Sequence, residues 1–209
     1  MNNQKNAIRY AIISSSCYVA FQVIANILSS KITILPFTSL AIDGGTIIYP
    51  LTFTLRDFVH KTIGKKESRV VVILAAAINL MMVGLFWIIG KMPADSSWNY
   101  QEAYNVILLP VWRITIGSII AQIISELIDT EAFSIFYKYV GDIKAVIISN
   151  TIALIFDSII FSLIAFSGTL SLQVVFQIIV ANIIIKFFVS VLSSPFIKLI
   201  PRSVSVDKI

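Results

Sequence analysis

The chain has 209 residues, of which 57% are hydrophobic and only 13% are charged, and its mean hydropathy is +0.91. Because about a quarter of the residues in a typical soluble domain are charged, this composition predicts that most of the outer surface faces lipid. The net charge of +5 does not indicate nucleic-acid binding, because the basic residues gather in short segments between apolar runs. The single cysteine, Cys17, excludes an internal disulfide and a cysteine-based zinc site.

Six apolar runs predict transmembrane helices, since about 20 apolar residues cross the hydrocarbon core. We place them approximately at residues 7–28, 46–63, 70–90, 106–128, 143–167 and 172–194. The first run has no small-residue cleavage pattern, which favours a span over a signal peptide. The fold class is therefore an all-α integral membrane protein, a six-helix bundle in which residues 1–209 form one transmembrane domain of the cell inner membrane.

The second run is the most irregular of the six. Asp43-Gly44-Gly45 precede it and Pro50 interrupts it, so we expect a spanning helix with a kink, because proline removes one backbone hydrogen bond. The apolar segment KITILPFTSLAIDGG before it is too short to cross the bilayer alone. This leaves room for a re-entrant or surface-lying hairpin between the first two helices.

The basic residues predict the orientation of the bundle. With six spans the two termini share one side, and placing them in the cytoplasm leaves only Lys31 and Lys91 in the outer loops. The inner segments then hold Lys5, Arg9, Lys61, Lys65, Lys66, Arg69, Lys138, Lys144, Lys198, Arg202 and Lys208. Cytoplasmic loops carry such an excess of Lys and Arg, so both termini are predicted to be cytoplasmic.

Six ionisable residues remain in or near the predicted spans: Arg56, Asp57, Arg113, Glu126, Asp157 and Lys186. An ionised side chain at mid-bilayer costs about 2.5–3.5 kcal/mol, and such residues usually face the bundle interior, pair with each other or mark a pathway. Their positions along the helices put Arg113 and Asp157 in the outer half of the bilayer. The same estimate puts Glu126 and Lys186 in the inner half. We therefore predict two ion pairs, Arg113 with Asp157 and Glu126 with Lys186.

Two interpretations of these charges compete. Buried salt bridges can simply fix the register of the helices. The same spans also carry uncharged polar residues: Asn26, Asn79, Gln122, Asn150 and Asn182. A stable bundle needs few such groups, whereas a polar cavity needs many, so the set favours a cavity.

Motifs of enzyme chemistry are missing from the sequence. There is no G-x-x-x-x-G-K-[ST] loop for ATP, and the only histidine, His60, excludes paired-histidine metal sites. Ser14, Ser15 and Ser16 lie on an apolar helix with no histidine nearby. We therefore expect no enzyme activity, no cofactor, no metal and no nucleic-acid partner.

Five stretches occur in register in one family of transporters: ANILSSKI (25–32), GGTIIYPLTFTLRDFVHKTIGKKESR (44–69), WRITIGSIIAQIISELIDTEAF (112–133), SNTIALIFDSIIFSLIAFSG (149–168) and IKFFVSVLSSPF (185–196). On these stretches the chain resembles the queuosine precursor transporter family, also called the vitamin uptake transporter family. The likeness runs from Ala25 to Phe196, nearly the whole chain. The resemblance depends on all five stretches, which occur in the same order and at matching spacing.

The resemblance gives some positions a family counterpart: Asn26, Lys31, Pro50, Asp57, Arg113, Glu126, Asp129, Asp157, Lys186 and Pro195. Two positions depart from the family pattern. Lys61 stands where many members have glutamate, and Ile63-Gly64 replaces an aromatic-glycine pair. Both departures lie in an inner loop.

Such a resemblance implies import of 7-deazapurine bases such as 7-cyano-7-deazaguanine, 7-aminomethyl-7-deazaguanine or queuine, for making the tRNA base queuosine. A guanine-like edge offers two adjacent N–H donors and one carbonyl acceptor, which a carboxylate and a cation or amide can bind. The carboxylate would be Asp157 or Glu126. The donor would be Arg113, Lys186, Asn150 or Asn182.

Aromatic side chains could stack on the base, as they do in nucleic-acid sites. The candidates are Tyr49, Phe53, Phe156 and Phe161. We therefore predict that the substrate site is drawn from Asn26, Tyr49, Phe53, Asp57, Arg113, Glu126, Asn150, Asp157, Asn182 and Lys186.

Two other functions stay open at this point. The chain could be the substrate-capture subunit of an energy-coupling-factor-type vitamin or base uptake complex, with Ala7 and Ala11 as a small-residue docking face. It could also be a structural or assembly factor. For an importer, proton coupling through Asp157 or Glu126, facilitated passage and a homodimeric state are open as well.

Overall fold

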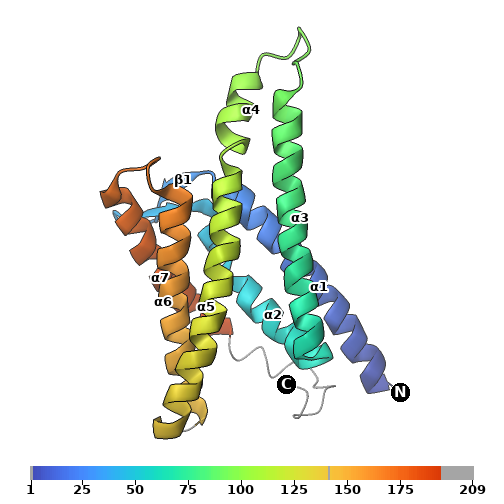
Figure 1. Cartoon of the computed structure of the whole chain (residues 1–209), viewed down its shortest axis with the longest axis vertical. Coiled ribbons are helices and arrows are strands. Elements are labelled where there is room, and N and C mark those ends of the chain that lie inside the picture. The colour runs from blue at the N-terminus through green and yellow to red at the C-terminus, as the bar shows by residue number, and fades with distance from the viewer. Residues whose placement is uncertain (1, 141, 194–209) are drawn as a thin grey trace.

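The structure, a computed structural model, describes residues 2–140 and 142–193. Its elements are α1 (Asn2–Leu28), β1 (Ile32–Ile34), β2 (Ala41–Asp43), the 3-10 helix η1 (Gly44–Ile47), α2 (Pro50–Ile63), α3 (Lys65–Lys91), α4 (Gln101–Leu108), α5 (Val111–Val140), α6 (Asp142–Phe166) and α7 (Leu172–Ser193) (Figure 1). The end of the sixth predicted span, the family position Pro195 and three of the predicted cytoplasmic cations (Lys198, Arg202 and Lys208) lie outside the described residues.

The protein is a helical, multi-pass membrane protein. Five stretches of the described residues are long and apolar enough to cross a bilayer: Asn6–Leu28, Lys66–Lys91, Gln101–Phe136, Ile147–Phe166 and Leu172–Leu192. They match five of the six predicted spans. In Figure 1 α1, α3 and α6 run from the lower to the upper end, whereas α2, α5 and α7 run back down.

The second predicted span differs from the expectation. Residues 46–63 form not one kinked helix but part of η1 followed by α2, whose 14 residues cover only about 21 Å along the axis, less than the roughly 30 Å hydrocarbon core. Pro50 is the first residue of α2, the position where a missing N–H breaks no helical bond. The proline therefore starts this helix instead of bending it.

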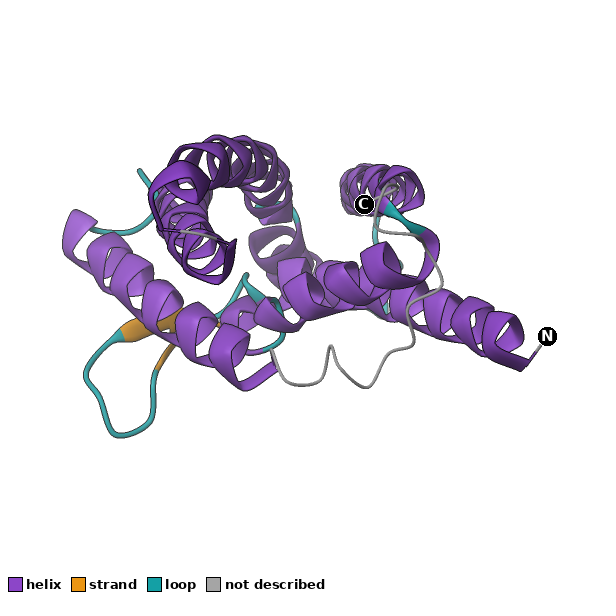
Figure 2. Cartoon of the chain, turned by 90° about the horizontal axis from the view of Figure 1, so that it is seen from below, coloured by secondary structure: helices purple, strands orange, loops and turns teal. Residues whose placement is uncertain are grey.

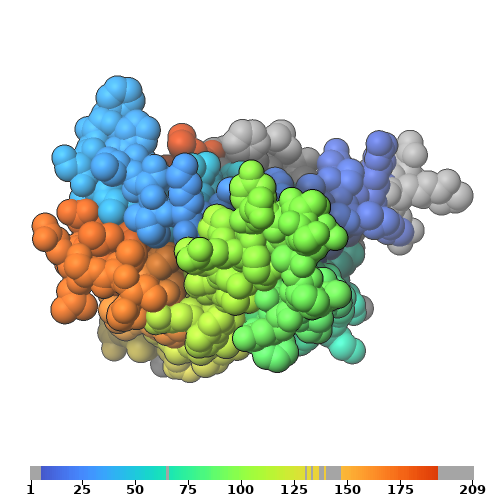
Figure 3. All heavy atoms as spheres, turned by 90° about the horizontal axis from the view of Figure 1, so that it is seen from above, coloured from blue at the N-terminus to red at the C-terminus, as the bar shows by residue number. Residues whose placement is uncertain are grey.

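The apolar segment before η1 is a two-stranded antiparallel hairpin, which adds a small sheet to the predicted all-α fold. Ile32 pairs with Asp43 and Ile34 pairs with Ala41. The loop between the strands projects away from the helices (Figure 2). At the upper end the hairpin lies beside the α6–α7 connection (Figure 3), and the Ala41 amide donates to Gln177 Oε1 of α7 at 3.2 Å.

A proline also divides the fourth predicted span, 106–128. It covers the end of α4 and the first half of α5, with Pro110 between the two helices. Proline lacks the N–H that would continue the helix and restricts the residue before it. Below this break α5 continues for 30 residues, a length of about 45 Å.

Small residues let α5 and α6 approach closely along their length. A methyl group on Gly117 of α5 would lie 3.3 Å from both the Phe161 carbonyl oxygen and Ile164 Cβ of α6. Close approach through small residues is how helices associate in lipid, where no hydrophobic force drives them together. This antiparallel pair forms one wall of the bundle.

The predicted docking face on α1 is covered by the chain itself. Ala7 and Ala11 are only 2% and 5% exposed, and α1 packs against α2 and α3. The expectation that these two alanines offer a face to a partner protein is therefore wrong.

Two glycines bring η1 against the end of α1. The Gly44 amide donates to the Lys31 carbonyl oxygen at 2.9 Å, and a methyl group on Gly44 would lie 2.6 Å from the Leu28 carbonyl oxygen. A methyl group on Gly45 would lie 2.5 Å from the Ala25 carbonyl oxygen and would overlap Ser29 Oγ. Only glycine fits at these positions, because backbone atoms cannot move aside.

This contact predicts the cost of a single methyl group. Gly45→Ala should lower the free energy of unfolding by about 1–3 kcal/mol, the usual penalty for overpacking. The matched control is Gly84→Ala in α3, where a methyl group would have no neighbour within 4 Å and helix propensity favours alanine by about 0.5–1 kcal/mol. Thermal unfolding of the purified protein in detergent measures both changes. Equal stability of the two variants would contradict the packing described for η1.

Candidate functional site

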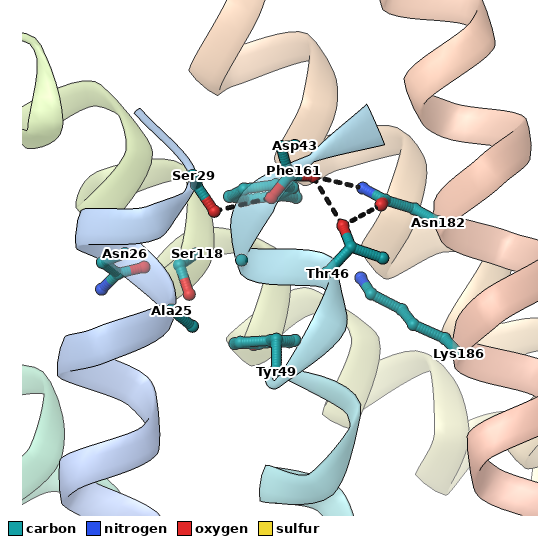
Figure 4. A pocket seen from close by; sticks show the side chains of 11 residues that line it. Ala25, Asn26, Ser29, Asp43, Thr46, Tyr49, Ser118, Phe161, Asn182 and Lys186 are labelled. Carbon is teal, nitrogen blue, oxygen red and sulfur yellow. Dashed lines mark hydrogen bonds between the residues drawn. The ribbon is translucent and has the colours of Figure 1, made fainter. Parts of the chain in front are cut away.

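A pocket lies where the end of α1, η1 and the start of α2 face α5, α6 and α7 (Figure 4). Its empty space of about 270 Å³ includes the gaps between atoms and space continuous with the outside, so a purine-sized ligand fits only after side chains move. The lining residues are Ala25, Asn26, Ser29, Asp43, Gly45, Thr46, Tyr49, Ser118, Phe161, Asn182 and Lys186. Most of them are polar, although the helices that carry them are strongly apolar. The pocket is therefore a polar chamber inside a membrane-embedded bundle.

A buried ion pair stands at one side of this chamber. Lys186 Nζ of α7 lies 2.5 Å from Asp157 Oδ2 of α6, and the two side chains are only 3% and 2% exposed. The ammonium group also lies over two aromatic rings, 5.2 Å from the centroid of Tyr49 and 5.8 Å from that of Phe161. Ring faces attract cations, so carboxylate and rings together hold the charge. Of the pair, Lys186 lines the pocket and Asp157 is not among the lining residues.

Both predicted ion pairs are wrong. Asp157 binds Lys186 instead of Arg113, and Glu126 Oε1 lies 2.6 Å from Arg56 Nη1 instead of near Lys186. Residue positions along a helix give the height of a side chain but not its direction around the axis. The depths estimated for the charged groups were also too coarse, because the ammonium group of a lysine can lie several ångströms along the helix axis from its own Cα atom.

Arg113 has a different task from the one expected. Its Nη2 donates to the carbonyl oxygens of Ile164 at 3.2 Å and Ser167 at 2.6 Å. These carbonyls stand at the C-terminal end of α6, where helical acceptors lack intrahelical partners and the helix dipole favours a cation. Arg113 therefore ties α5 to the end of α6.

Asp43, which the sequence did not single out as a site residue, is the carboxylate that lines the pocket. It is 1% exposed. Its Oδ1 accepts from Ser29 Oγ at 2.6 Å, and its Oδ2 accepts from Thr46 Oγ1 at 2.7 Å and from Asn182 Nδ2 at 3.2 Å (Figure 4). Thr46 Oγ1 also contacts Asn182 Oδ1. All the groups that bond Asp43 here are neutral.

Two further polar contacts connect α1 to its neighbours next to the pocket and below it. Asn26 Nδ2 donates to Asn79 Oδ1 of α3 at 2.7 Å. Gln122 Nε2 of α5 and Gln22 Nε2 both donate to the Tyr18 hydroxyl, at 2.9 and 2.8 Å. These buried amides satisfy one another, as buried polar groups in lipid must.

The structure divides the predicted site residues into two groups. Asn26, Tyr49, Asn182 and Lys186 line the pocket together with Phe161. Phe53 packs edge-on against Tyr49 with the ring centroids 5.6 Å apart.

The other predicted residues lie away from the pocket. Asp57 and Asn150 are exposed, and Phe156, an expected stacking residue, is 44% exposed. Glu126 pairs with Arg56 and is itself 42% exposed. The structure does not bring these four side chains to the chamber.

Four polar or charged lining residues were missed: Ser29, Asp43, Thr46 and Ser118. One signal could have found part of this set. Asp43 is followed by two glycines, and such pairs often allow a close backbone approach. The hydroxyls of Ser29 and Ser118 carry no comparable signal, because serine is common on membrane helices as a small packing residue.

Comparison with known families agrees with the architecture. The profile of the family described as "Putative vitamin uptake transporter" matches residues 43–200, more than half of the chain. The chain belongs to this family of vitamin uptake transporters. No solved structure matches it.

This member of the vitamin uptake transporter family has a named bacterial relative. It is 26% identical over 156 residues to the "Probable queuosine precursor transporter" of Bacillus subtilis, and the match covers 73% of this chain and 68% of the relative. The family resemblance expected from the sequence is confirmed. The matched profile begins at Asp43 and includes Tyr49 and the pocket residues of η1, α5, α6 and α7.

The ion pair predicts a test of stability. Lys186→Met leaves the Asp157 carboxylate buried and unpaired, so the free energy of unfolding should fall by about 3–5 kcal/mol. Lys186→Met combined with Asp157→Asn should recover most of that loss, because no buried charge then remains. Arg56→Met is the control, since Glu126 is 42% exposed and an accessible pair contributes only about 0–1 kcal/mol.

Thermal unfolding in detergent measures all three variants. A double variant as unstable as Lys186→Met, or an Arg56→Met variant that is equally unstable, would contradict the assignment of Lys186–Asp157 as the buried pair.

Proposed function

We propose that the protein imports queuosine precursors, 7-deazapurine bases, across the membrane that it spans. The observation that carries this proposal is the polar chamber inside an apolar bundle, lined by two aromatic rings and a lysine ammonium group. Family membership and the name of the Bacillus subtilis relative support it. Because the chain belongs to a transporter family, we take the molecule that binds in the chamber to be the transported molecule.

The aromatic residues suit a planar ligand. Tyr49 and Phe161 both line the chamber and both flank the Lys186 ammonium group. A base that stacks on an aromatic side chain gains about 1–3 kcal/mol, whichever base it is. Stacking therefore supplies affinity for any deazapurine, and the polar groups supply the choice among them.

The polar groups suit the edge of a guanine-like base. An ammonium group has three N–H donors, and Lys186 directs one of them to Asp157, so others can reach a ring carbonyl in the chamber. The Asn26 and Asn182 amides and the Ser118 hydroxyl can accept from ring and amino N–H groups. In this assignment Asp157 holds Lys186 in place and does not touch the base.

Two polar layers stand between the chamber and the lower end of the bundle. Gln122 lies four residues below Ser118 on α5, about 6 Å, and Glu126 lies eight residues below it, about 12 Å. Gln122 bonds Tyr18 of α1, and Glu126 bonds Arg56 of α2. We place the lower end in the cytoplasm because positive charge accumulates there. Release of the base then requires both layers to part.

Queuosine in tRNA is the direct readout of this function. The gene should restore queuosine to cells that lack both precursor synthesis and their own importer and are fed 7-cyano-7-deazaguanine, 7-aminomethyl-7-deazaguanine or queuine. Purified protein in liposomes, without any partner, should take up the same radiolabelled base. If none of the three bases gave rescue in cells or uptake into liposomes, that result would contradict the proposed function.

Two phenylalanines on α6 separate a binding role from a packing role. Phe161→Leu removes a ring from the chamber and should raise the KM for uptake about tenfold, the equivalent of about 1.4 kcal/mol within the range for one stacked base. Phe156→Leu is the matched control, because that ring is 44% exposed on the same helix and outside the pocket. Equal KM values for the two variants, at equal protein levels in the membrane, would contradict the stacking role of Phe161.

A further inference from the structure

Asn79 is a polar residue in the middle of an otherwise apolar helix. It is the only amide, hydroxyl or charged side chain among residues 70–90 of α3, and it is 1% exposed. Its Nδ2 donates to the Ala75 carbonyl oxygen at 2.8 Å, and its Oδ1 accepts from Asn26 Nδ2 of α1 at 2.7 Å. Asn26 lines the chamber, whereas Asn79 does not. Asn79 therefore acts on the chamber only through Asn26.

The bond to Ala75 decides which end of the Asn79 amide faces Asn26. The oxygen and nitrogen of an amide side chain are assigned from their hydrogen-bond partners. A backbone carbonyl oxygen only accepts hydrogen bonds, so the Asn79 atom that lies 2.8 Å from it is the nitrogen. The other end of the amide, which faces Asn26, is therefore the oxygen.

The orientation of Asn79 in turn decides the orientation of Asn26. Because Asn79 presents an oxygen, Asn26 directs its Nδ2 toward α3. Its Oδ1 then points the other way, toward the chamber (Figure 4). Within the part of the chain that the structure describes, no group donates to this oxygen. The α1 wall of the chamber therefore offers a ligand a hydrogen-bond acceptor and not a donor.

Reversing either amide would bring two acceptors together. If Asn26 turned its nitrogen to the chamber, its oxygen would meet Asn79 Oδ1 without a hydrogen between them. If Asn79 turned as well, its own oxygen would meet the Ala75 carbonyl oxygen. Both asparagines are buried, at 4% and 1% exposed, and a buried polar group without its hydrogen bond costs free energy. The acceptor therefore stays turned to the chamber when a ligand arrives.

We propose that Asn79 is a positioning residue that makes the chamber select bases with an amino group over bases with a carbonyl group at the same ring carbon, which rests on the proposed function of this chamber. Asn26 lies across the chamber from Lys186 (Figure 4). The carbonyl and amino groups stand at opposite ends of a guanine-like edge, so a base whose carbonyl binds Lys186 turns its amino group to Asn26 Oδ1. A second carbonyl group there would meet that oxygen without a hydrogen, and the base is rejected.

Uptake of two radiolabelled bases into liposomes tests this selectivity. 7-Cyano-7-deazaguanine carries the amino group, and 7-cyano-7-deazaxanthine carries a carbonyl group in its place. The wild-type protein should have a KM about tenfold lower for the amino base, the effect of one hydrogen bond lost at a buried acceptor. In Asn79→Leu the Asn26 amide is free to turn its Nδ2 to the carbonyl group, so this preference in KM should fall about tenfold.

Further variants separate positioning from packing. Asn79→Asp keeps an oxygen that accepts from Asn26 Nδ2, so it should retain the wild-type preference. Gln22→Leu is the matched control, because it removes another buried amide of α1, one that bonds the Tyr18 hydroxyl and does not line the chamber. It should leave the ratio of the two KM values unchanged. Asn79→Ala replaces the leucine variant if that variant does not reach the membrane, and the same fall in preference is expected.

The outcomes separate this proposal from the function on which it rests. A wild-type protein that carries both bases with equal KM overturns the selectivity. A preference that stays unchanged in Asn79→Leu and Asn79→Ala, including uptake of both bases weakened by the same factor, leaves Asn79 with a packing role only and overturns its positioning role. Failure of the wild-type protein to carry any deazapurine refutes the proposed function and with it the selectivity.

Discussion

A lysine and an aspartate cannot be buried among apolar helices unless each neutralises the other, and this requirement fixes the facing sides of α6 and α7. Lys186 and Asp157 meet 2.5 Å apart, almost fully buried. Once Lys186 is held there, its ammonium group lies over Tyr49, which immediately precedes α2, and over Phe161 of α6. One pair of charges thus positions both the cation and the aromatic rings of the chamber. The rest of the site is built around them.

The opposite wall depends on backbone proximity instead of charge. Gly44 and Gly45 let η1 contact the end of α1, which places Thr46 and Asp43 beside Ser29. Asn182, one helical turn from Lys186 on α7, joins this network to the ion-pair side. The broken segment β1–β2–η1–α2 therefore brings polar backbone and side chains against α1 and α7, where protein surrounds them, the condition under which a membrane protein tolerates irregular backbone.

Much of the fold was readable from hydropathy, because a bilayer demands long apolar helices. Five of the predicted spans appear in the structure. Pro50 and Pro110 were visible as irregularities, but whether a proline bends a helix or begins one depends on the tertiary contacts around it. Asp43 was noticed only as part of a turn, because its burial comes from contacts with Ser29, Thr46 and Asn182 that are distant in sequence or neutral in charge.

The pairing of the buried charges could not be predicted from the sequence for a different reason. On α6 and α7 apolar residues surround the whole helix, so the pattern of hydrophobicity does not show which face points inward. The presence of intramembrane charges therefore predicted a polar interior. It could not predict that Asp157 pairs with Lys186, or that Arg113 binds the carbonyl oxygens at the end of α6.

A structure of the protein with a bound 7-deazapurine, determined by electron cryomicroscopy, tests the central claim most directly. The base should lie in the chamber against Tyr49 and Phe161, with its carbonyl oxygen within hydrogen-bond distance of Lys186 Nζ and with Asp157 still paired to Lys186. A base bound elsewhere in the bundle, with Lys186 and Asp157 closed off from it, would contradict the claim that this pair builds the transport site.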